Sequence, residues 1–249
     1  MIYKTAQCSE KGGRSYNEDS VLFEFRGTIF AGVVADGLGG HGGGEVASQI
    51  VTDTLVNGFM RAPDLNPEAI KKLFELANNE VLAKQTPSVQ MKSTAVGVFC
   101  NAEGMVVAHT GDSRFYRFIN GKLNFQTKDH SVSQMAVLSG EIPQDKIRFH
   151  EDRNKVLRAL GNDVAIKPDI TAFEAPRPFQ AFMLCTDGFW EYILEEEMEI
   201  DLAKSGIPQE WLDYMIARIS RRINGKNDNF SALAVFVVDA TEDITIKEW

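Results

Sequence analysis

The sequence predicts a single domain of the α+β class. Its 249 residues contain no proline- or serine-rich linker and no block of like charge that would divide them, and 44% of them are hydrophobic. A chain of this length and composition can bury a sizeable core. Short apolar runs separated by tight turns predict strands, and stretches with apolar residues every three or four positions predict amphipathic helices.

The first half of the chain predicts two groups of strands on either side of a helix pair. The candidate helices are 45–60 and 66–82, and the second has the Asn66-Pro67 start that favours a helix N-terminus. The two helices are expected to form one layer of the packed domain. The candidate strands are 2–9, 21–25, 28–35, 93–100 and 104–109.

The second half combines a clear hairpin with a long polar connection. Asn120-Gly121 is a two-residue turn that predicts a hairpin between strands 115–119 and 122–127. A connection as long as 128–161 is more often functional than structural in a chain rich in strands. We therefore expect a mobile flap near the site at about 132–155. The remaining candidates are helices 132–139, 154–160, 189–203 and 208–223 and strands 181–185 and 231–238.

The other elements are organised around the stretch from Phe30 to Glu45, FAGVVADGLGGHGGGE. An apolar run reads as a buried strand ending at Asp36, and six glycines follow within the next eight residues. Glycines let main-chain groups approach a ligand closely and adopt positive φ. The turn can therefore present a carboxylate and bare backbone to a small charged ligand.

One candidate ligand is a dinucleotide. Gly37, Gly39 and Gly42 have the G-x-G-x-x-G spacing after a strand and before a helix. A pyrophosphate would lie against the like charge of Asp36, however, and the next ~20 residues, where a ribose-binding acid on a second strand is expected, read as helix. The sequence therefore favours the other candidate, a cation with Asp36 as a ligand.

Acids recur at other predicted strand ends, without a matching set of histidines or cysteines. Carboxylate and carbonyl oxygens suit Mg²⁺ or Mn²⁺ and argue against zinc. Two such ions ~3.5–4 Å apart can activate water for displacement at phosphorus. A set of ordinary turn acids is an equal alternative, since aspartate is common in turns. The acids concerned are Glu18, Asp19, Asp36, Asp112, Asp187 and Asp228.

Composition restricts the partners and the compartment. With 26 Lys+Arg against 35 Asp+Glu, the net charge of −9 disfavours a nucleic-acid partner. No signal peptide and no apolar run of the ~18 residues needed to span a bilayer are evident, so a cytoplasmic location without membrane attachment is expected. Cys8, Cys100 and Cys185 are widely spaced beside apolar residues and read as buried thiols.

Eight motifs, in register over most of the chain, resemble the PP2C (PPM) family of metal-dependent Ser/Thr protein phosphatases, bacterial type. The match runs from about Gly12 to Val238. The motifs are RSYNEDS at 14–20, DGLGGHGGGEVAS at 36–48, STAVG at 93–97, GDSRFY at 111–116, KDHS at 128–131, RNKVLRALG at 153–161, LCTDGFWE at 184–191 and NDNFSALAV at 227–235.

This resemblance implies a four-layer αββα sandwich, with two central antiparallel β-sheets flanked by helix pairs and two Mn²⁺ or Mg²⁺ ions in a cleft at one edge. It assigns Asp36 as the bridging ligand, the Gly37 carbonyl as a further ligand, and Asp187 and Asp228 to the second metal. Glu18 and Asp19 match an acidic pair, of which one ligates directly or through water. Asp112 with Asp187 matches a third, weaker site, and Arg14 matches the phosphate-binding arginine, whose planar fork suits two phosphate oxygens.

The resemblance also implies hydrolysis of phosphoserine and phosphothreonine by direct attack of a metal-bridging hydroxide, with no phosphoenzyme. Leu38 departs from the eukaryotic members that have a proton-donating histidine there. His41 could replace it, although a structural hydrogen bond at the helix entry is the favoured role for His41. Buried Cys185 is expected to be inert.

The implied partners are phosphorylated Ser/Thr proteins and a cognate Ser/Thr kinase, with the enzyme acting as a monomer. Two other classes stay open at this stage. One is a catalytically inactive PP2C-like regulator, which the complete set of acids disfavours. The other is a hydrolase of small phosphoesters, which its preference for aryl phosphates over phosphopeptides would reveal.

Overall fold

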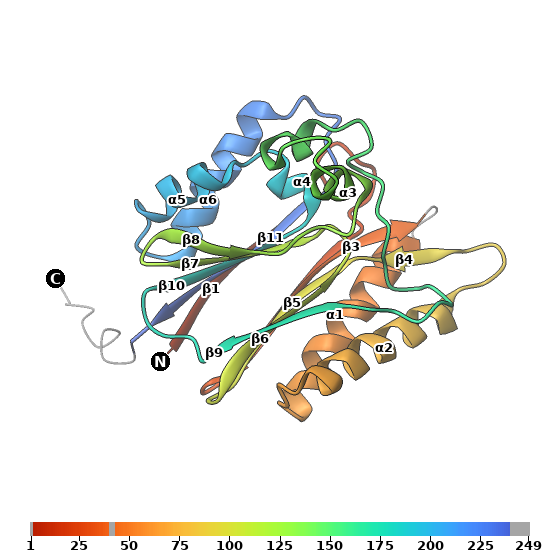
Figure 1. Cartoon of the computed structure of the whole chain (residues 1–249), viewed down its shortest axis with the longest axis horizontal. Helices are drawn as coiled ribbons and strands as arrows, with labels where there is room; N and C mark the ends of the chain where they lie inside the picture. Colours follow the sequence, from red (N-terminus) through yellow and green to blue (C-terminus); the bar gives the residue numbers. More distant parts are fainter. Residues whose placement is uncertain (1, 40–42, 240–249) are drawn as a thin grey trace.

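A computed structural model describes residues 2–39 and 43–239 of the chain (Figure 1). The strands are β1 (Ile2–Glu10), β2 (Asp19–Arg26), β3 (Ile29–Gly39), β4 (Met91–Ser93), β5 (Ala95–Cys100), β6 (Gly104–Thr110), β7 (Arg114–Ile119), β8 (Lys122–Gln126), β9 (Asp169–Glu174), β10 (Gln180–Cys185) and β11 (Phe230–Val238). The helices are α1 (Gly43–Arg61), α2 (Pro67–Lys84), α3 (Val132–Leu138), the 3₁₀ helix η1 (Gln144–Phe149), α4 (Asp187–Trp190), α5 (Glu195–Leu202) and α6 (Pro208–Arg222).

Two antiparallel sheets stack face to face between pairs of helices. One sheet has the order β1-β11-β10-β7-β8 and the other β2-β3-β5-β6-β9, with β4 pairing to β3. Figure 1 shows α1 and α2 on the outer face of the second sheet and α5 and α6 on the outer face of the first. The predicted four-layer αββα sandwich is therefore confirmed.

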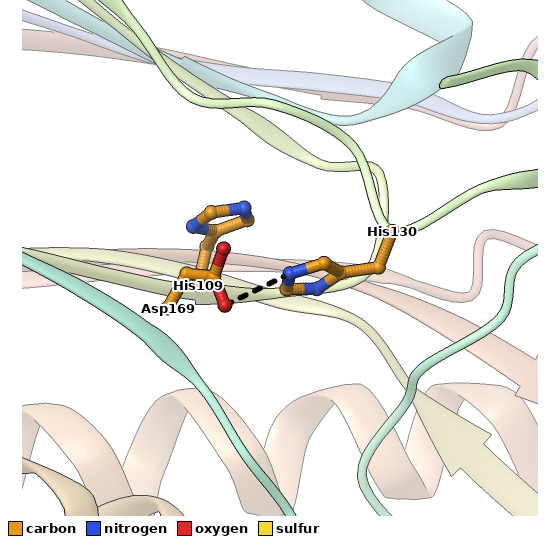
Figure 2. A group of neighbouring side chains, drawn as sticks. All are labelled: His109, His130 and Asp169. Carbon is orange, nitrogen blue, oxygen red and sulfur yellow. Dashed lines mark ion pairs between the residues drawn. The ribbon is translucent and has the colours of Figure 1, made fainter. Parts of the chain in front are cut away.

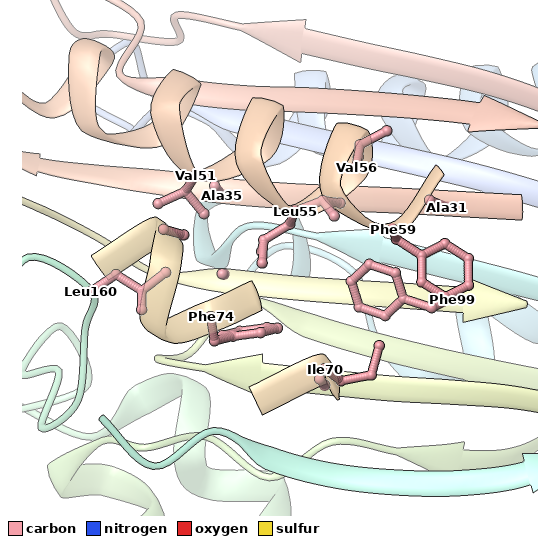
Figure 3. Packing of buried hydrophobic residues seen from close by; sticks show 14 of the residues in the cluster. Ala31, Ala35, Val51, Leu55, Val56, Phe59, Ile70, Phe74, Phe99 and Leu160 are labelled. Carbon is pink, nitrogen blue, oxygen red and sulfur yellow. The ribbon is translucent and has the colours of Figure 1, made fainter. Parts of the chain in front are cut away.

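Each interface between layers is filled by apolar side chains. Phe30, Val96 and Phe182 belong to a cluster that joins the inner faces of the two sheets. Phe59 of α1 and Phe74 of α2 pack on the outer face of the second sheet (Figure 3), and Trp211 of α6 packs on that of the first. Burial of each such side chain stabilises the fold by about 1.5–3 kcal/mol, which holds the layers in fixed register.

Most predicted elements are confirmed, but the strand expected at 93–100 is two strands. Thr94 separates β4 from β5, because its main-chain N–H donates to the carbonyl oxygen of Asp36 at 2.8 Å. The Thr94 hydroxyl also accepts from the Asp36 N–H at 2.9 Å. The break therefore holds the strand end that carries the central aspartate.

The long connection differs from its prediction. The helix expected at 154–160 is wrong, because Leu160 exchanges two main-chain hydrogen bonds with Ser93, at 2.8 and 3.0 Å. This pairing holds Leu160 in an isolated β-bridge, so tertiary contacts override the helical spacing. A 3₁₀ helix, η1, forms in the polar stretch before it.

Two further corrections concern the second half. The helix expected at 189–203 is divided into α4 and α5, and strand β9 was not predicted at all. β9 is an edge strand that pairs with β6 alone, and its mixed burial lacks the alternation that identifies a strand in sequence. Within the described residues no helix has both the length and the apolar character needed to cross a membrane.

Candidate metal centre

A cavity of about 520 Å³ opens where strand ends of both sheets meet. Five carboxylates and one arginine are among its lining residues. The lining consists of Arg14, Ser15, Tyr16, Glu18, Asp36, Gly37, Leu38, Gly39, Asp112, Asn154, Val156, Asp187, Asp228 and Asn229. The structure thus brings together seven of the eight residues predicted for the site, from segments more than 200 positions apart.

Asp36 and Gly37 are held by main-chain pairing on both sides. Gly37 lies opposite Ser93 in the β3–β4 pair, and its N–H donates to the Glu18 carbonyl oxygen at 3.0 Å. A Cβ at Gly37 would lie 2.1 Å from the Gly44 carbonyl oxygen, a distance that no side chain could occupy. Glycine is therefore required here by close backbone approach.

The acidic pair Glu18–Asp19 is divided between two places. Glu18 lines the cavity, whereas Asp19 does not. Asp19 lies opposite Asp36 in the β2–β3 register, and its Oδ2 accepts from the Thr186 hydroxyl at 2.9 Å. Glu18 lies just before β2, whereas Asp19 is its first residue.

Asp187 and Asp228 come from neighbouring strands of the first sheet. Asp187 begins α4 directly after β10, and Asp228 precedes β11. Gly188 packs so closely that a Cβ there would lie 2.0 Å from the Asn229 carbonyl oxygen. An Arg14 Nη2 atom lies 2.5 Å from Asp228 Oδ2. This ion pair places Arg14, the one cation among the described lining residues, against one of the acids.

Asn229 is a site residue that the sequence reasoning missed. Its side-chain oxygen accepts from the Glu18 N–H at 2.9 Å, and its amide nitrogen donates to the carbonyl oxygens of Lys11 and Tyr16 at 2.7 and 2.8 Å. One side chain thus joins the segment bearing Arg14 and Glu18 to the start of β11. Its neighbour in the sequence, Asp228, was the only signal.

Asp112 reaches the cavity from the loop between β6 and β7. Gly111 precedes it with φ +103°, a conformation that favours glycine. The Ser113 hydroxyl hydrogen-bonds the Thr94 hydroxyl at 2.7 Å, and the indole of Trp190 donates to the Asp112 carbonyl oxygen at 2.9 Å. Trp190 was not predicted as part of the site.

The carboxylates raise one another's pKa values. Burial and neighbouring acids raise the pKa of Asp112 to about 7 and that of Asp19 to about 7. Burial, together with the surrounding aspartates, also raises the pKa of Asp36 and Asp187 well above the ordinary range. Like charges this close are costly unless cations neutralise them.

The residues present fit divalent cations. Oδ1 of Asp112 and Oδ1 of Asp19 are buried without a hydrogen-bond partner in the described part of the chain. Buried polar atoms are normally satisfied, so such atoms indicate a missing partner. The donor set is entirely oxygen and strongly anionic, which suits Mn²⁺ or Mg²⁺.

The flap segment, residues 132–155, touches the cavity only at its end, where Asn154 is in the lining. Its η1 portion is anchored to the domain, since Ile147 is fully buried and Arg148 is 7% exposed. These contacts argue against a freely moving flap over the site. His41, for which a structural role was favoured over proton donation, lies outside the described residues, as does Gly42.

A second cluster, His109, His130 and Asp169, has metal-ligand atoms within 4.8 Å of one another (Figure 2). The main-chain N–H of Gly111 donates to Nδ1 of His130 at 3.1 Å, so the ring proton of neutral His130 is on Nε2. His130 Nε2 lies 3.3 Å from Asp169 Oδ1 and 3.2 Å from the Arg158 guanidinium nitrogen Nη1, so a cation already stands beside the nitrogen that a metal ion would have to use.

The hydrogen bonds therefore assign these histidines a structural role. The His109 and His130 rings stack with centroids 4.7 Å apart, and burial lowers the pKa of both, that of His130 to about 4. Arg158 Nη1 lies 3.2 Å from Asp169 Oδ1 and would repel a metal ion. The pair instead holds the Gly111 turn that presents Asp112.

Comparisons with known proteins agree on one family. The model of the protein phosphatase 2C family matches residues 10–222. The chain is 31% identical over 232 residues to a serine/threonine phosphatase, stp, of Listeria monocytogenes, covering 89% of this chain and 90% of that protein. The crystal structure of the Mycobacterium tuberculosis serine/threonine phosphatase PstP/Ppp superposes with a TM-score of 0.81 at 28% identity, covering 96% of this chain and 100% of that one.

A second solved structure bears on the cofactor. It is the catalytic domain of the serine/threonine protein phosphatase PstP in complex with two manganese ions. It superposes with a TM-score of 0.77 at 29% identity, and the match covers 95% of this chain and 99% of that one.

Proposed function

This chain belongs to the protein phosphatase 2C family, and we propose that its acid-lined cavity is the site at which phosphoserine and phosphothreonine are hydrolysed. The protein is an enzyme, a metal-dependent serine/threonine phosphatase that uses Mn²⁺ or Mg²⁺. The observation that supports the location is the convergence of five carboxylates, with raised pKa values at Asp36 and Asp187, on one cavity. A cavity so anionic would repel a phosphate group unless cations were bound there.

The residues that would hold two metal ions are Asp36, Asp187 and Asp228, with the Gly37 carbonyl and Glu18. Asp112, with Asp187, would hold a third ion. Asp19 would act beside Asp36, directly or through water, because it lies opposite Asp36 in the β2–β3 register and its buried Oδ1 has no partner among the described residues. When bound, Mn²⁺ or Mg²⁺ would lower the pKa of a water molecule and neutralise charge on phosphoryl oxygens.

Arg14 would bind the substrate phosphate. Arg14 belongs to the lining, its side chain is 59% exposed, and its guanidinium contacts Asp228 at 2.5 Å, so it is already held at the rim. A planar fork with paired donors matches two phosphate oxygens and orients the phosphoryl group for in-line displacement. No side-chain nucleophile is needed, and Cys185 is unsuited to be one because burial raises its pKa well above the ordinary value.

Protonation of the leaving alkoxide differs from that in relatives with a histidine at the position of Leu38. Leu38 lines the cavity and has no proton to give. Of the described lining residues none is a histidine, so we propose that water, rather than an imidazole from them, supplies this proton.

The biological setting is also part of the proposal. A phosphoprotein substrate implies a Ser/Thr kinase that made it from a nucleoside triphosphate. The three cysteines have free thiols, which fits a reducing compartment such as the cytoplasm. The core shared by both sheets supports a single catalytic domain, and we propose that this domain acts as a monomer.

The proposal is tested by chelating the purified protein and restoring Mn²⁺, Mg²⁺ or Zn²⁺ separately, with p-nitrophenyl phosphate and a phosphothreonine peptide as substrates. We expect activity to return with Mn²⁺ or Mg²⁺ and to be lost in Asp36→Asn. Asp169→Asn is the matched control, because Asp169 belongs to the histidine cluster. Loss of metal-dependent activity in Asp169→Asn, with Asp36→Asn still active, would contradict the proposal and place the metal at the histidine cluster.

A further inference from the structure

Trp190 connects two of the acid-bearing segments. It ends α4, the single helical turn that begins with Asp187, and it is 1% exposed. Its indole Nε1 donates to the main-chain carbonyl oxygen of Asp112 at 2.9 Å. Since Asp112 lies in the loop between β6 and β7, this bond fixes Asp112 relative to Asp187 across two separate parts of the chain.

The indole itself is held in place by Arg114. The Arg114 guanidinium carbon lies 3.4 Å from the centroid of the Trp190 ring, a stacked cation–π contact. Arg114 is fully buried and bonded at 2.7 and 2.8 Å to both carboxylate oxygens of Asp129. The bidentate ion pair therefore fixes the guanidinium on which the ring stacks, and turning the ring away would lose that buried contact.

The flap segment reaches the same helix through Arg148 of η1. Its Nε donates to the Trp190 carbonyl oxygen at 3.1 Å, and its Nη2 donates to the Ile193 carbonyl oxygen at 3.1 Å and to Glu195 Oε1 at 2.7 Å. The last carbonyls of a helix lack internal partners, and a cation near them is favourable. Arg148 thus adds a second donor to the Trp190 carbonyl oxygen, which also accepts from the Ile193 N–H at 3.3 Å, and binds the turn that follows α4.

We propose that Trp190 is the positioning residue for the Asp112–Asp187 pair and that Arg148 makes the flap segment part of its support. The affinity for the metal ion held by this pair then depends on how the flap is anchored, which makes the flap a determinant of metal occupancy. The inference rests on the metal site of the proposed function. It assigns no chemical step to Trp190 or Arg148, which touch neither substrate nor metal.

The experiment compares Trp190→Phe with Trp211→Phe by calorimetric titration of Mn²⁺ into the chelated full-length protein. Trp211 is a close match, because it is fully buried and its indole donates to the Met198 carbonyl oxygen at the same 2.9 Å. We expect Trp190→Phe to bind the weakest ion about 10- to 100-fold less tightly, with the tighter ions unchanged. Trp211→Phe should bind every ion as the wild type does.

Arg148→Lys gives an independent test that keeps the positive charge and replaces the three-bonded guanidinium. We expect the same ion to bind more weakly and the Mn²⁺ concentration for half-maximal activity to rise, with full activity recovered at high Mn²⁺. If Trp190→Phe does not fold, the Mn²⁺ affinity of Arg148→Lys alone tests the proposed positioning role. A purely structural role would lower the melting temperature of Trp190→Phe and Trp211→Phe alike and leave Mn²⁺ affinity unchanged.

The outcomes separate the inference from the proposed function. If the wild type binds no Mn²⁺, both are wrong. If the wild type binds Mn²⁺ and both Trp190→Phe and Arg148→Lys bind it with the same affinities, the positioning role is wrong and the metal site stands.

Discussion

Replacing Asp112 by asparagine should change how the stability of the metal-free protein depends on pH. Asp112 is 1% exposed, and burial with neighbouring acids raises its pKa from 3.8 to about 7. The folded protein therefore holds a proton on Asp112 that the unfolded chain has released. Asp112 then contributes stability that is fully present below its unfolded pKa and is lost as the pH rises through about 7.

The size of the effect follows from the pKa shift. At about pH 5 Asp112 is already ionised in the unfolded chain, whereas in the folded protein it keeps its proton up to about pH 7. About two pH units of the shift therefore lie within the window from about pH 5 to about pH 8. At about 1.4 kcal/mol per unit, the wild type should lose about 3 kcal/mol more stability over this window than Asp112→Asn. Removing this charge also relieves Asp187, for which Asp112 is the largest neighbouring charge, and this acts in the same direction.

The assay is urea unfolding in the presence of a chelator at both pH values, followed by circular dichroism. Any cost of burying the asparagine amide is nearly independent of pH and cancels in the comparison. Asp53→Asn, at an exposed position of α1, should behave as the wild type. Equal declines in the free energy of unfolding for wild type and Asp112→Asn would refute the electrostatic account. Saturating Mn²⁺ should also reduce the wild-type decline, because bound cations stabilise the ionised carboxylates.

Three further changes test other parts of the site. Arg14→Lys should lower kcat/KM for a phosphothreonine peptide about tenfold or more, because a lysine ammonium cannot donate to two phosphate oxygens as the planar guanidinium does. An unchanged kcat/KM in steady-state kinetics would exclude Arg14 from phosphate binding. Phe149 is 74% exposed and lines a groove with Arg153 and Tyr192 beside the site. Phe149→Ser should therefore raise KM for phosphoprotein substrates without affecting p-nitrophenyl phosphate, and parallel changes for both substrates would contradict a role in substrate choice. Gly188→Ala would place a Cβ 2.0 Å from a backbone carbonyl oxygen. We therefore expect the free energy of unfolding, measured by thermal unfolding, to fall by about 2 kcal/mol or more. A melting temperature equal to that of the wild type would show that the backbone can shift to accommodate the methyl group.

Local sequence patterns predicted most of the elements because those elements obey local rules. Asn120-Gly121 adopts φ values of 51° and 77°, as a two-residue hairpin turn requires. Asn66 caps α2 by accepting from the Glu68 N–H at 2.9 Å, as the Asn-Pro pair predicted. The predictions were wrong where contacts between distant segments determine the local structure. Leu160, for example, pairs with Ser93 and does not belong to a helix.

The candidate site was predicted in its residue types but not in its supports. Asp36, Asp187 and Asp228 each lie at or near a strand end, which a sequence can show. Asn229 and Trp190 act through hydrogen bonds to main-chain atoms far away in the sequence. No pattern reports such partners, because any main-chain carbonyl or N–H can serve as one.

The sequence by itself predicted the chemistry available to this protein, since it shows six acids at predicted strand ends and Arg14 shortly before the first pair of them. The tertiary structure decided which of the acids share a cavity. It placed Glu18 in the lining and Asp19 outside the lining, opposite Asp36 in the β2–β3 pair. It also gave the buried histidines a structural role, because the Gly111 N–H binds Nδ1 of His130 and the Arg158 guanidinium lies beside Nε2. Both outcomes depend on distances between segments that only the packing of the two sheets sets.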